Sequence, residues 1–222
     1  MARKANKRHI KSLAAPVFFG VERKKNKYVS KPIPGTHSKE RSVSVELALK
    51  RVGLVKSRME AVRLLKDGAV AVNSKKINNV RYPVGFSDRV EVGKESFAIG
   101  IDKHGVISIE KEKGGAQRVM KVVGKYKTKN GEVRIRLHDG TTLNIGSEPK
   151  INDSVRMEKG GAKLITLREG SSCFVIGGVH VGSSGKIASV KEGTRNTEKS
   201  VKIETGDGKS FETLAKNIIV TS

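Results

Sequence analysis

Short strand-like segments separated by glycine-rich turns follow one another from residue 94 to the end of the chain. In residues 133–137 apolar and basic side chains alternate with period two, and Asp139-Gly140 leads into a second such run at residues 141–145, which is typical of a β-hairpin. Another hairpin is expected over residues 155–167, and further strands near 97–101, 106–109, 173–176, 186–190, 200–204, 210–213 and 217–220. This spacing predicts small antiparallel β domains, the last five strands closing a small barrel.

Helical periodicity appears between residues 42 and 67. The apolar residues there recur on one helix face: Val45, Ala48, Leu49 and Val52. Gly53 suits the left-handed position that ends a helix, and Ser57 with Glu60 forms a capping box that begins a second helix. That helix ends at Asp67-Gly68, and a strand, a turn and a closing strand follow at residues 69–72, 73–76 and 89–92. The sequence therefore predicts an α+β chain that is mostly β.

The chain carries 45 Lys and Arg against 22 Asp and Glu, a net charge of +23. A compact state with this excess repels itself unless a polyanion neutralises it, and each phosphate that Lys or Arg neutralises releases a counterion. An anionic membrane surface is the alternative, but it favours an amphipathic helix with a broad Leu, Phe or Trp face. The chain has no Trp and only 4% aromatic residues. We therefore expect nucleic acid as the partner, recognised by backbone and shape more than by stacking on every base.

Other classes of protein find little support. No run of about 18 apolar residues is present, so no membrane-spanning helix is expected. The apolar patch at residues 13–21 contains Pro16 and is too weak for a signal peptide, although an organelle transit peptide remains an alternative. Cys173 is the only cysteine, which fits a buried strand position, a reducing compartment and the absence of a disulfide or a cysteine-rich zinc site. The five histidines lack metal-like spacing, so we expect no enzyme, metal or cofactor.

Residues 1–41 hold twelve Lys and Arg against two Asp and Glu. Pro32 and Pro34 favour an extended path, and we expect the segment to order only on a partner, with residues 14–19 fixing it on protein or on a base. A solvated tail is the alternative. The candidate RNA-binding residues of this segment are Arg3, Lys4, Lys7, Arg8, His9 and Lys11.

The helix pair with its following strands, over residues 46–61 and 64–73, resembles the alpha-L RNA-binding module. The amides that begin the second helix, at Ser57, form a potential anion site between Lys56 and Arg58. Further cations extend this surface: Arg63, Lys66, Lys75 and Lys76. One alternative is a helix hairpin with a solvated basic face. Another is a DNA-reading helix-turn-helix, which the strand and basic turn after the second helix disfavour.

Residues 175–187 combine an apolar strand, a glycine-rich turn and a second apolar strand, and they resemble the KOW motif. Glycines there would supply positive φ and allow the backbone to approach a phosphate or ribose, next to Lys186: Gly177, Gly178, Gly182 and Gly185. A tight barrel corner without a ligand is the alternative.

Several segments occur in an order that resembles the archaeal and eukaryotic-type small-subunit ribosomal protein S4e family over essentially residues 3–221. They are residues 9–16, 34–38, the helix pair, 82–88, 138–140, 151–153, the glycine-rich turn and 217–220. The family's turn usually carries Asn and Arg where this chain has His180 and Ser183. The chain ends at Ser222 without the basic tail of eukaryotic cytosolic members, so we expect an archaeal-like version.

The resemblance implies a structural constituent of the small ribosomal subunit that binds rRNA in the cytoplasm beside neighbouring ribosomal proteins, without catalysis, small-molecule substrate, membrane contact or homo-oligomer. Four parts are expected: a basic rRNA-threading segment at 1–41, the alpha-L module at 42–93, a central β domain at 94–169 and a KOW barrel at 170–222. The rivals are an RNA-modifying enzyme with an alpha-L module and a free transcription or translation factor with a KOW barrel. An enzyme would need a catalytic constellation that the short strands lack.

Overall fold

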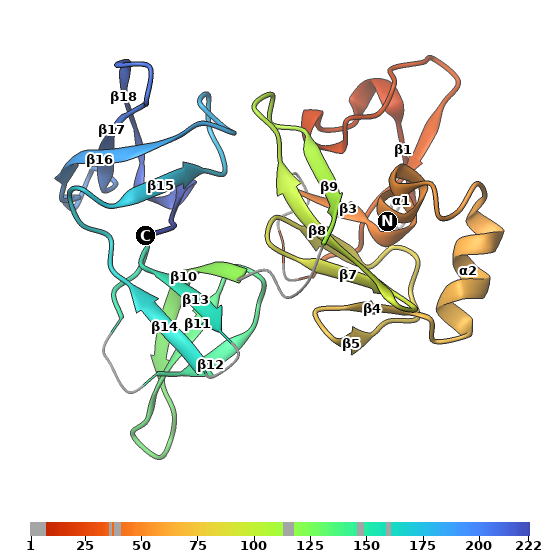
Figure 1. The fold of residues 1–222 in the computed structure, drawn as a ribbon, viewed down its shortest axis with the longest axis horizontal. Helices are drawn as coiled ribbons and strands as arrows, with labels where there is room; N and C mark the ends of the chain where they lie inside the picture. Colours follow the sequence, from red (N-terminus) through yellow and green to blue (C-terminus); the bar gives the residue numbers. More distant parts are fainter. Residues whose placement is uncertain (1–7, 36, 38–40, 113–117, 146–148, 159–160) are drawn as a thin grey trace, which may run out of the picture. The chain divides into compact units, whose positions relative to one another are not determined.

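The computed structural model describes residues 8–35, 37, 41–112, 118–145, 149–158 and 161–222. Within these residues the chain is mostly β with two α-helices, which confirms the predicted fold class at this level (Figure 1). It forms two compact units, the first from residues 1–100 and 106–114 and the second from residues 101–105 and 115–222. The expected boundary at residue 94 falls inside a hairpin of the first unit, because the strands on either side of it pair with each other.

The first unit contains three sheets. Two are two-stranded, β1 with β2 and β3 with β6, and one is five-stranded in the order β5-β4-β7-β8-β9. The elements are β1 His9–Lys11, β2 Tyr28–Ser30, β3 Ser42–Ser44, α1 Val45–Val52, α2 Arg58–Lys66, β4 Val70–Val72, β5 Lys75–Lys76, β6 Pro83–Gly85, β7 Arg89–Val92, β8 Glu95–Ile101 and β9 Ile107–Lys111. Two 3-10 helices, η1 Ser12–Ala14 and η2 Val17–Phe19, lie between β1 and β2.

Both α-helices begin and end as the sequence predicts. The Ser44 hydroxyl accepts from the Leu47 amide at the start of α1, and Gly53 ends that helix with φ 83°. Ser57 and Glu60 form the expected capping box at the start of α2. The predicted turn after β4 is shorter than expected, since Asn73 and Ser74 adopt positive φ and the two lysines after them already form β5.

The amino-terminal segment differs from the expectation that it orders only on a partner. Its residues 8–35 fold onto the first unit, where η2 lies against β3 and the Phe18 and Phe19 rings are 6% and 1% exposed. Gly20 ends η2 with φ 54°, and a Cβ there would collide with the Arg51 guanidinium. That guanidinium donates to the carbonyls of Gly20 and Ile107, which ties the segment to α1 and β9. The aromatic pair therefore anchors the segment on the chain's own core.

A buried carboxylate, Asp88, organises the turn between β6 and β7. Its oxygens lie 2.7 Å from His37 Nε2 and accept from Asn73 Nδ2 at 2.8 Å and from the Gly85 amide at 2.9 Å. Burial alone raises the pKa of Asp88, but the hydrogen bonds with His37, Asn73 and Gly85 outweigh it and hold the pKa below its ordinary 3.8. Asp88 thus joins three segments that are distant in sequence.

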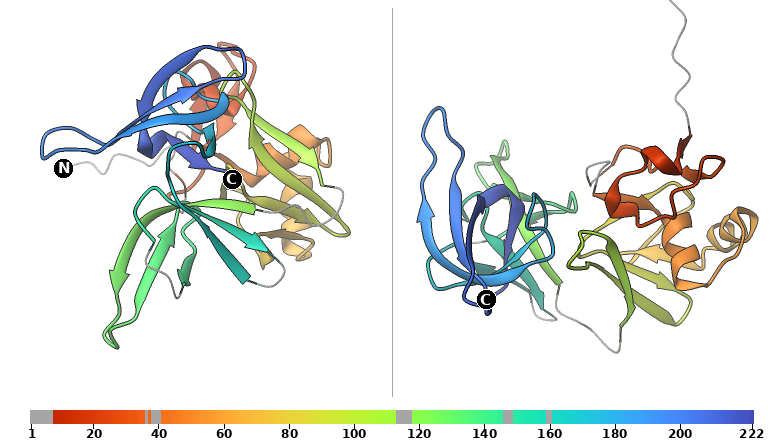
Figure 2. Two further views of the ribbon diagram at one scale, coloured as in Figure 1. Left: turned by 60° about the vertical axis from the view of Figure 1, so that its left-hand side comes forward. Right: turned by 90° about the horizontal axis from the view of Figure 1, so that it is seen from above.

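The second unit consists of two five-stranded antiparallel sheets, in the orders β12-β11-β10-β13-β14 and β18-β17-β16-β15-β19. The strands are β10 Arg118–Lys127, β11 Val133–Leu137, β12 Thr142–Asn144, β13 Ser154–Glu158, β14 Gly161–Ile165, β15 Ser172–Val175, β16 Ser184–Lys191, β17 Ser200–Glu204, β18 Ser210–Leu214 and β19 Ile218–Val220, with η3 Ala215–Asn217 before β19. Figure 2 shows how strongly the second sheet bends. Cys173 belongs to its core, and burial raises the pKa of the thiol to about 11.

Lysine 121 joins the two sheets of this unit from inside. Its side chain is 3% exposed, and its ammonium donates to the carbonyls of Ala215 and Ile218, the latter at 2.9 Å. The Ser154 hydroxyl on β13 adds a bond by accepting from the Val220 amide at 2.9 Å. Hydrogen bonds from a buried ammonium to backbone carbonyls offset part of the cost of burying its charge.

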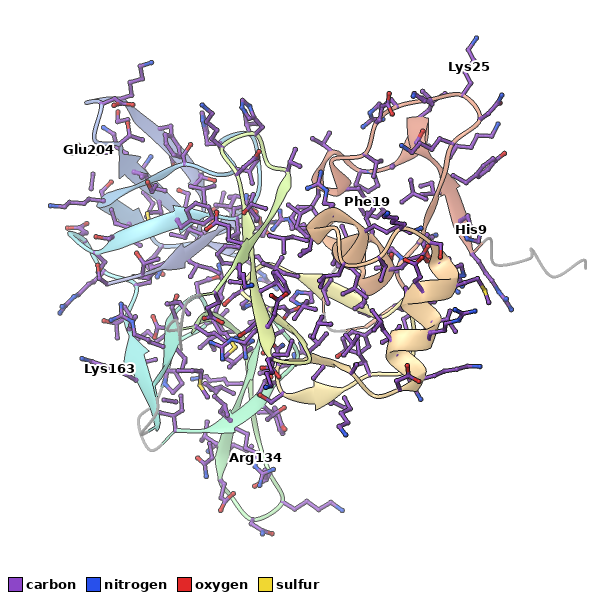
Figure 3. The ribbon with its side chains drawn as sticks, turned by 45° about the vertical axis from the view of Figure 1, so that its right-hand side comes forward. His9, Phe19, Lys25, Arg134, Lys163 and Glu204 are labelled. Carbon is purple, nitrogen blue, oxygen red and sulfur yellow. The ribbon has the colours of Figure 1, made fainter. Side chains whose placement is uncertain are left out.

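Replacing Lys121 by Ala removes the ammonium that donates to the Ala215 and Ile218 carbonyls, and it opens a cavity. We expect Lys121→Ala to lower the free energy of unfolding of the second unit by about 3 kcal/mol, measured by urea denaturation followed by circular dichroism. Lys163→Ala, an exposed change on β14 (labelled in Figure 3), serves as the control and should stay within about 0.5 kcal/mol of the parent. Equal stability of the two variants would contradict the assignment.

The depressed pKa of Asp88 predicts a pH dependence. Its ionised form stabilises the fold above the unfolded value near 3.8, and this contribution is lost as the pH falls through the lower folded pKa. Asp88→Asn should therefore lower the free energy of unfolding by about 2–3 kcal/mol at pH 7 and by much less at acid pH. Denaturant titrations at a series of pH values test this, with the exposed Asp207→Asn as the control. A difference that does not change with pH would refute it.

Candidate nucleic-acid interface

The helix pair and the β4–β5 hairpin present a set of cations that we call the α2–β5 cations: Lys56, Arg63, Lys66, Lys75 and Lys76. All five side chains are exposed, and none forms an ion pair with another described residue. The buried residues of α2, Ala61 and Leu65, hold the helix against the rest of the unit. Positive charge that has no acidic partner in the fold is available to an external anion.

Arg58 differs from these cations. Its guanidinium donates to Glu46 Oε2 at 2.8 Å, while Lys50 donates to Glu46 Oε1 at 2.8 Å. Glu46 lies on α1 and is 6% exposed. Arg58 therefore joins α2 to α1, and its charge is already offset within the fold.

The expected anion site at the start of α2 contains a carboxylate of the protein itself. Glu60 Oε2 accepts from the Lys56 amide at 2.7 Å and from the Ser57 amide at 3.4 Å, and the Ser57 hydroxyl accepts from the Glu60 amide. These contacts hold the pKa of Glu60 below its ordinary value, and the hydrogen bond from the Lys56 amide has the largest effect. A phosphate at this end of the helix would meet that negative charge, so the helix side offers a better contact than the helix end.

The amino-terminal hairpin carries a second group of exposed basic side chains. Arg8, His9 and Lys11 are exposed on or beside β1, whereas Arg3, Lys4 and Lys7 lie outside the described residues. Lys11 pairs across the hairpin with Tyr28, whose ring is 60% exposed. Figure 3 shows His9 on this hairpin and Lys25 pointing away from it at the tip of the connecting loop.

Sequence reasoning missed Tyr28. The available signal was the short run Tyr28-Val29-Ser30, in which the apolar Val29 is buried. Adjacent side chains of a strand point to opposite faces, so a buried Val29 places the Tyr28 ring on the other face.

The glycine-rich turn of the second unit meets the expectations in part. Gly178 and Gly182 have φ 87° and 85°, as predicted, but Gly177 and Gly185 do not adopt positive φ. Gly185 is required for another reason, because a Cβ there would collide with the Glu204 carbonyl on the neighbouring strand. The prediction of positive φ is therefore wrong for Gly177 and Gly185.

Side chains around this turn are open to solvent. Lys186 is exposed on β16, and Val179 is 95% exposed at the tip of the turn. His180, at one of the two positions that depart from the S4e pattern, stacks on Phe211 with ring centroids 4.1 Å apart. The turn therefore offers backbone, one cation and a stacked ring pair.

Within the described ranges, no group of three or more His, Cys, Asp or Glu side chains could hold a metal ion. No helix in that same part of the chain is long and apolar enough to cross a membrane.

Two protein-family models match parts of this chain, and one of them covers most of the helix pair. Residues 47–90 match the model of the S4 domain, and residues 4–40 match that of the RS4NT domain. The chain is thus by class an S4-domain protein, with the described cations of α2 and β5 on that domain.

Curated relatives match almost the whole chain. Small ribosomal subunit protein eS4 of Staphylothermus marinus is 31% identical over 231 residues, which cover 96% of this chain and 91% of the relative. The protein of the same name from Methanocella arvoryzae is 29% identical and covers 96% and 93% of the two chains. The crystal structure of 30S ribosomal protein S4e from Thermoplasma acidophilum has the same fold, with a TM-score of 0.66 and 22% identity over 82% of this chain and 95% of that one.

The chain therefore belongs to the small ribosomal subunit protein eS4 family. The resemblance predicted from the sequence motifs is thereby confirmed.

The contrast between Arg58 and Arg63 can be measured. Arg58→Ala leaves one oxygen of the buried Glu46 without its donor and should lower the free energy of unfolding of the first unit by about 1–2 kcal/mol. Arg63→Ala, at the exposed sixth residue of the same nine-residue helix, should change it by less than about 0.5 kcal/mol. Urea denaturation of the two variants decides the matter, and equal losses would argue against the structural role of Arg58.

Proposed function

We propose that this protein is a structural constituent of the small ribosomal subunit, where it binds and stabilises folded rRNA through phosphate contacts. The observation that carries the proposal is the set of α2–β5 cations, which form no close ion pair with a described carboxylate and lie on the S4 domain of an eS4-family chain. Each phosphate that such a cation neutralises releases counterions and adds affinity. Ser57 and Arg58 support this surface by fixing the start of α2.

The amino-terminal part, residues 1–41, extends the same footprint. Arg8, His9 and Lys11 would contact rRNA phosphates from the β1–β2 hairpin. Arg3, Lys4 and Lys7, which lie outside the described residues, are proposed to contact rRNA phosphates as well. Because residues 8–35 already pack on the first unit, binding would not need to order that stretch, which lowers its entropic cost. The α2–β5 cations and this hairpin belong to one compact unit.

The carboxy-terminal part, residues 170–222, is proposed as the KOW barrel. Its strand order, with the last strand paired back to β15, and the bend of the sheet support this assignment. Gly178 and Gly182 would bring backbone close to a phosphate or ribose, and Lys186 would supply charge beside them. Gly177 and Gly185 would serve this contact by keeping the turn narrow. The central β domain expected at 94–169 follows the alpha-L module of residues 42–93 along the chain. Since residues 95–100 and 106–114 belong to the first unit, the part proposed as a separate central domain is the sheet of β10 to β14.

The proposed setting is the cytoplasmic ribosome of an archaeal-like organism, beside neighbouring small-subunit proteins, since the named relatives come from archaea. A ribosomal constituent needs no catalysis, cofactor or self-association. A free factor with similar domains is the rival class, and an RNA-modifying enzyme is the other. Sedimentation separates them, because a structural constituent remains with small subunits through a high-salt wash and a factor is released.

Reversing the charge of four of the five α2–β5 cations tests the phosphate contacts. Combining Arg63→Glu, Lys66→Glu, Lys75→Glu and Lys76→Glu should weaken binding to transcribed small-subunit rRNA and reduce the slope of log K against log salt by about 3. Filter binding over a salt series measures both quantities. The control is a protein with Lys209→Glu, an exposed turn residue of the second unit.

Unchanged affinity and slope in the fourfold variant, with its melting curve intact, would remove this surface from the binding site. A similar loss in the Lys209→Glu control would show that net charge matters and position does not.

A further inference from the structure

The outer face of strands β10, β11 and β12 groups polar, cationic and aromatic side chains that neither the sequence analysis nor the family comparison assigned. In the register of the sheet, Tyr126 pairs with Arg134 and Arg134 with Asn144. In the next row Gly124 pairs with Arg136 and Arg136 with Thr142. Directly paired residues of antiparallel strands point to the same face. We call the five side chains of these rows the Tyr126 face: Tyr126, Arg134, Arg136, Thr142 and Asn144.

Burial shows that this face is the solvent side of the sheet. Ile135 and Leu137, which alternate with the two arginines on β11, are each 1% exposed and belong to the core of this sheet. Arg134 and Arg136 are exposed, and the Tyr126 ring is 48% exposed. Of the nine Phe and Tyr residues in the chain, Tyr28 and Tyr126 are the two with exposed side chains. An exposed aromatic ring is therefore rare in this protein, and this one lies in a cationic setting.

The charge around Tyr126 is strongly positive. Residues 123–137 include five Lys and Arg and one acid, Glu132. That acid lies 3.6 Å from Arg134, but both side chains are about half exposed, and surface pairs of this kind are weak. Figure 1 shows the β10–β11 hairpin projecting from the rest of its sheet, and Figure 3 places Arg134 on it.

Gly124 has no side chain to cover the backbone of β10 beside Arg136. A Cβ at this glycine would lie 3.7 Å from Arg136 Nη2 and 3.9 Å from Arg136 Nε, so the guanidinium lies close over the backbone of β10. Arg136 forms no ion pair with another described residue. Along β11 the two arginines are two residues apart, about 7 Å, which lets them contact different phosphates of one strand.

We propose that the Tyr126 face binds an unpaired segment of RNA, with one base stacked on the Tyr126 ring and flanking phosphates held by Arg134 and Arg136. Thr142 and Asn144 supply hydrogen-bond groups for a base edge or a 2′-hydroxyl. A base pair inside a duplex exposes no face to a ring, whereas a loop or bulge does, so the aromatic residue favours unpaired nucleotides. The inference rests on the proposed function, because it adds a base-stacking contact to a phosphate-binding protein.

A tryptophan at position 126 reports stacking directly. The chain has no Trp, so Tyr126→Trp gives the full-length protein a single indole. Its fluorescence should be quenched by a short single-stranded RNA of mixed sequence and much less by the blunt duplex of the same sequence. Lys163→Trp, an exposed position on the opposite edge strand β14, is the matched control and should respond weakly to both. No quenching at saturating single strand, or equal quenching by the duplex, would overturn the proposal.

Affinity measurements on conservative and truncating variants complete the test. Tyr126→Ala should weaken binding of the single-stranded RNA by about 5- to 100-fold, whereas Tyr126→Phe keeps the ring and should stay within about twofold of the parent. Arg134→Ala and Arg136→Ala should each reduce the salt slope by about 0.7, the value for one phosphate of a single strand. Unchanged binding by Tyr126→Ala would overturn the proposal.

The two levels of inference can fail separately. If the parent protein binds neither small-subunit rRNA nor small subunits, the proposed function itself is wrong. If the parent binds and Tyr126→Ala binds equally, only the Tyr126 face is wrong. A photoreactive residue placed at 126 should crosslink to RNA in small subunits that contain the protein. Crosslinks to a neighbouring protein would instead identify a protein-binding surface and overturn the assignment.

Discussion

The fold depends on how a cation-rich chain uses its few carboxylates. There are 22 Asp and Glu against 45 Lys and Arg, and several of these acids bind backbone amides inside the fold. Asp88 accepts from the Gly85 amide, Glu60 from the Lys56 amide, and Asp153 from the Leu167 amide at 2.9 Å. These carboxylates fix turns and helix starts. Carboxylates that accept from backbone amides do not pair with exposed cations, so those cations remain available to a polyanion.

The same division separates structural from binding cations. Arg51, Arg58 and Lys121 donate to carbonyls or to a buried carboxylate and hold segments together. Arg63 and Arg136 lie in solvent on regular elements whose opposite side is buried. Elements fixed in this way present their cations without ordering on arrival of the ligand, which reduces the entropic cost of binding. Whether a basic residue of this protein is structural or available for binding therefore depends on whether its side chain donates to an acceptor within the fold. Its charge alone does not distinguish the two roles.

Local patterns in the sequence predicted local structure well. The bounds of α1 followed from the spacing of its apolar residues and from Gly53, and those of β11 from strict alternation. The longest strand, β10, was missed because Lys121 occupies a core position and a bulge follows Val122, which breaks the alternation. The burial of Phe19 was missed because it depends on contacts with β3, which is distant in sequence.

The candidate site was predictable in composition and less so in geometry. The exposed α2–β5 cations were all named from the sequence, but the engagement of Arg58 with Glu46 depends on the packing of two helices. The need for glycine at 185 comes from a carbonyl on another strand, and the pairing of Tyr126 with Arg134 from the register of a sheet. Such relations arise between segments, and no single segment encodes them.

Lysine reactivity toward an acylating reagent, compared between the free protein and the protein in small subunits, tests the central claim most directly. The account predicts that Lys66, Lys75 and Lys76 lose reactivity in the particle. Lys191 and Lys216, which are paired with Glu212 and Glu198 in the fold, should change little and serve as internal references. Unpaired lysines that react equally in the free and assembled states would show that they do not meet phosphates, and the account would be wrong.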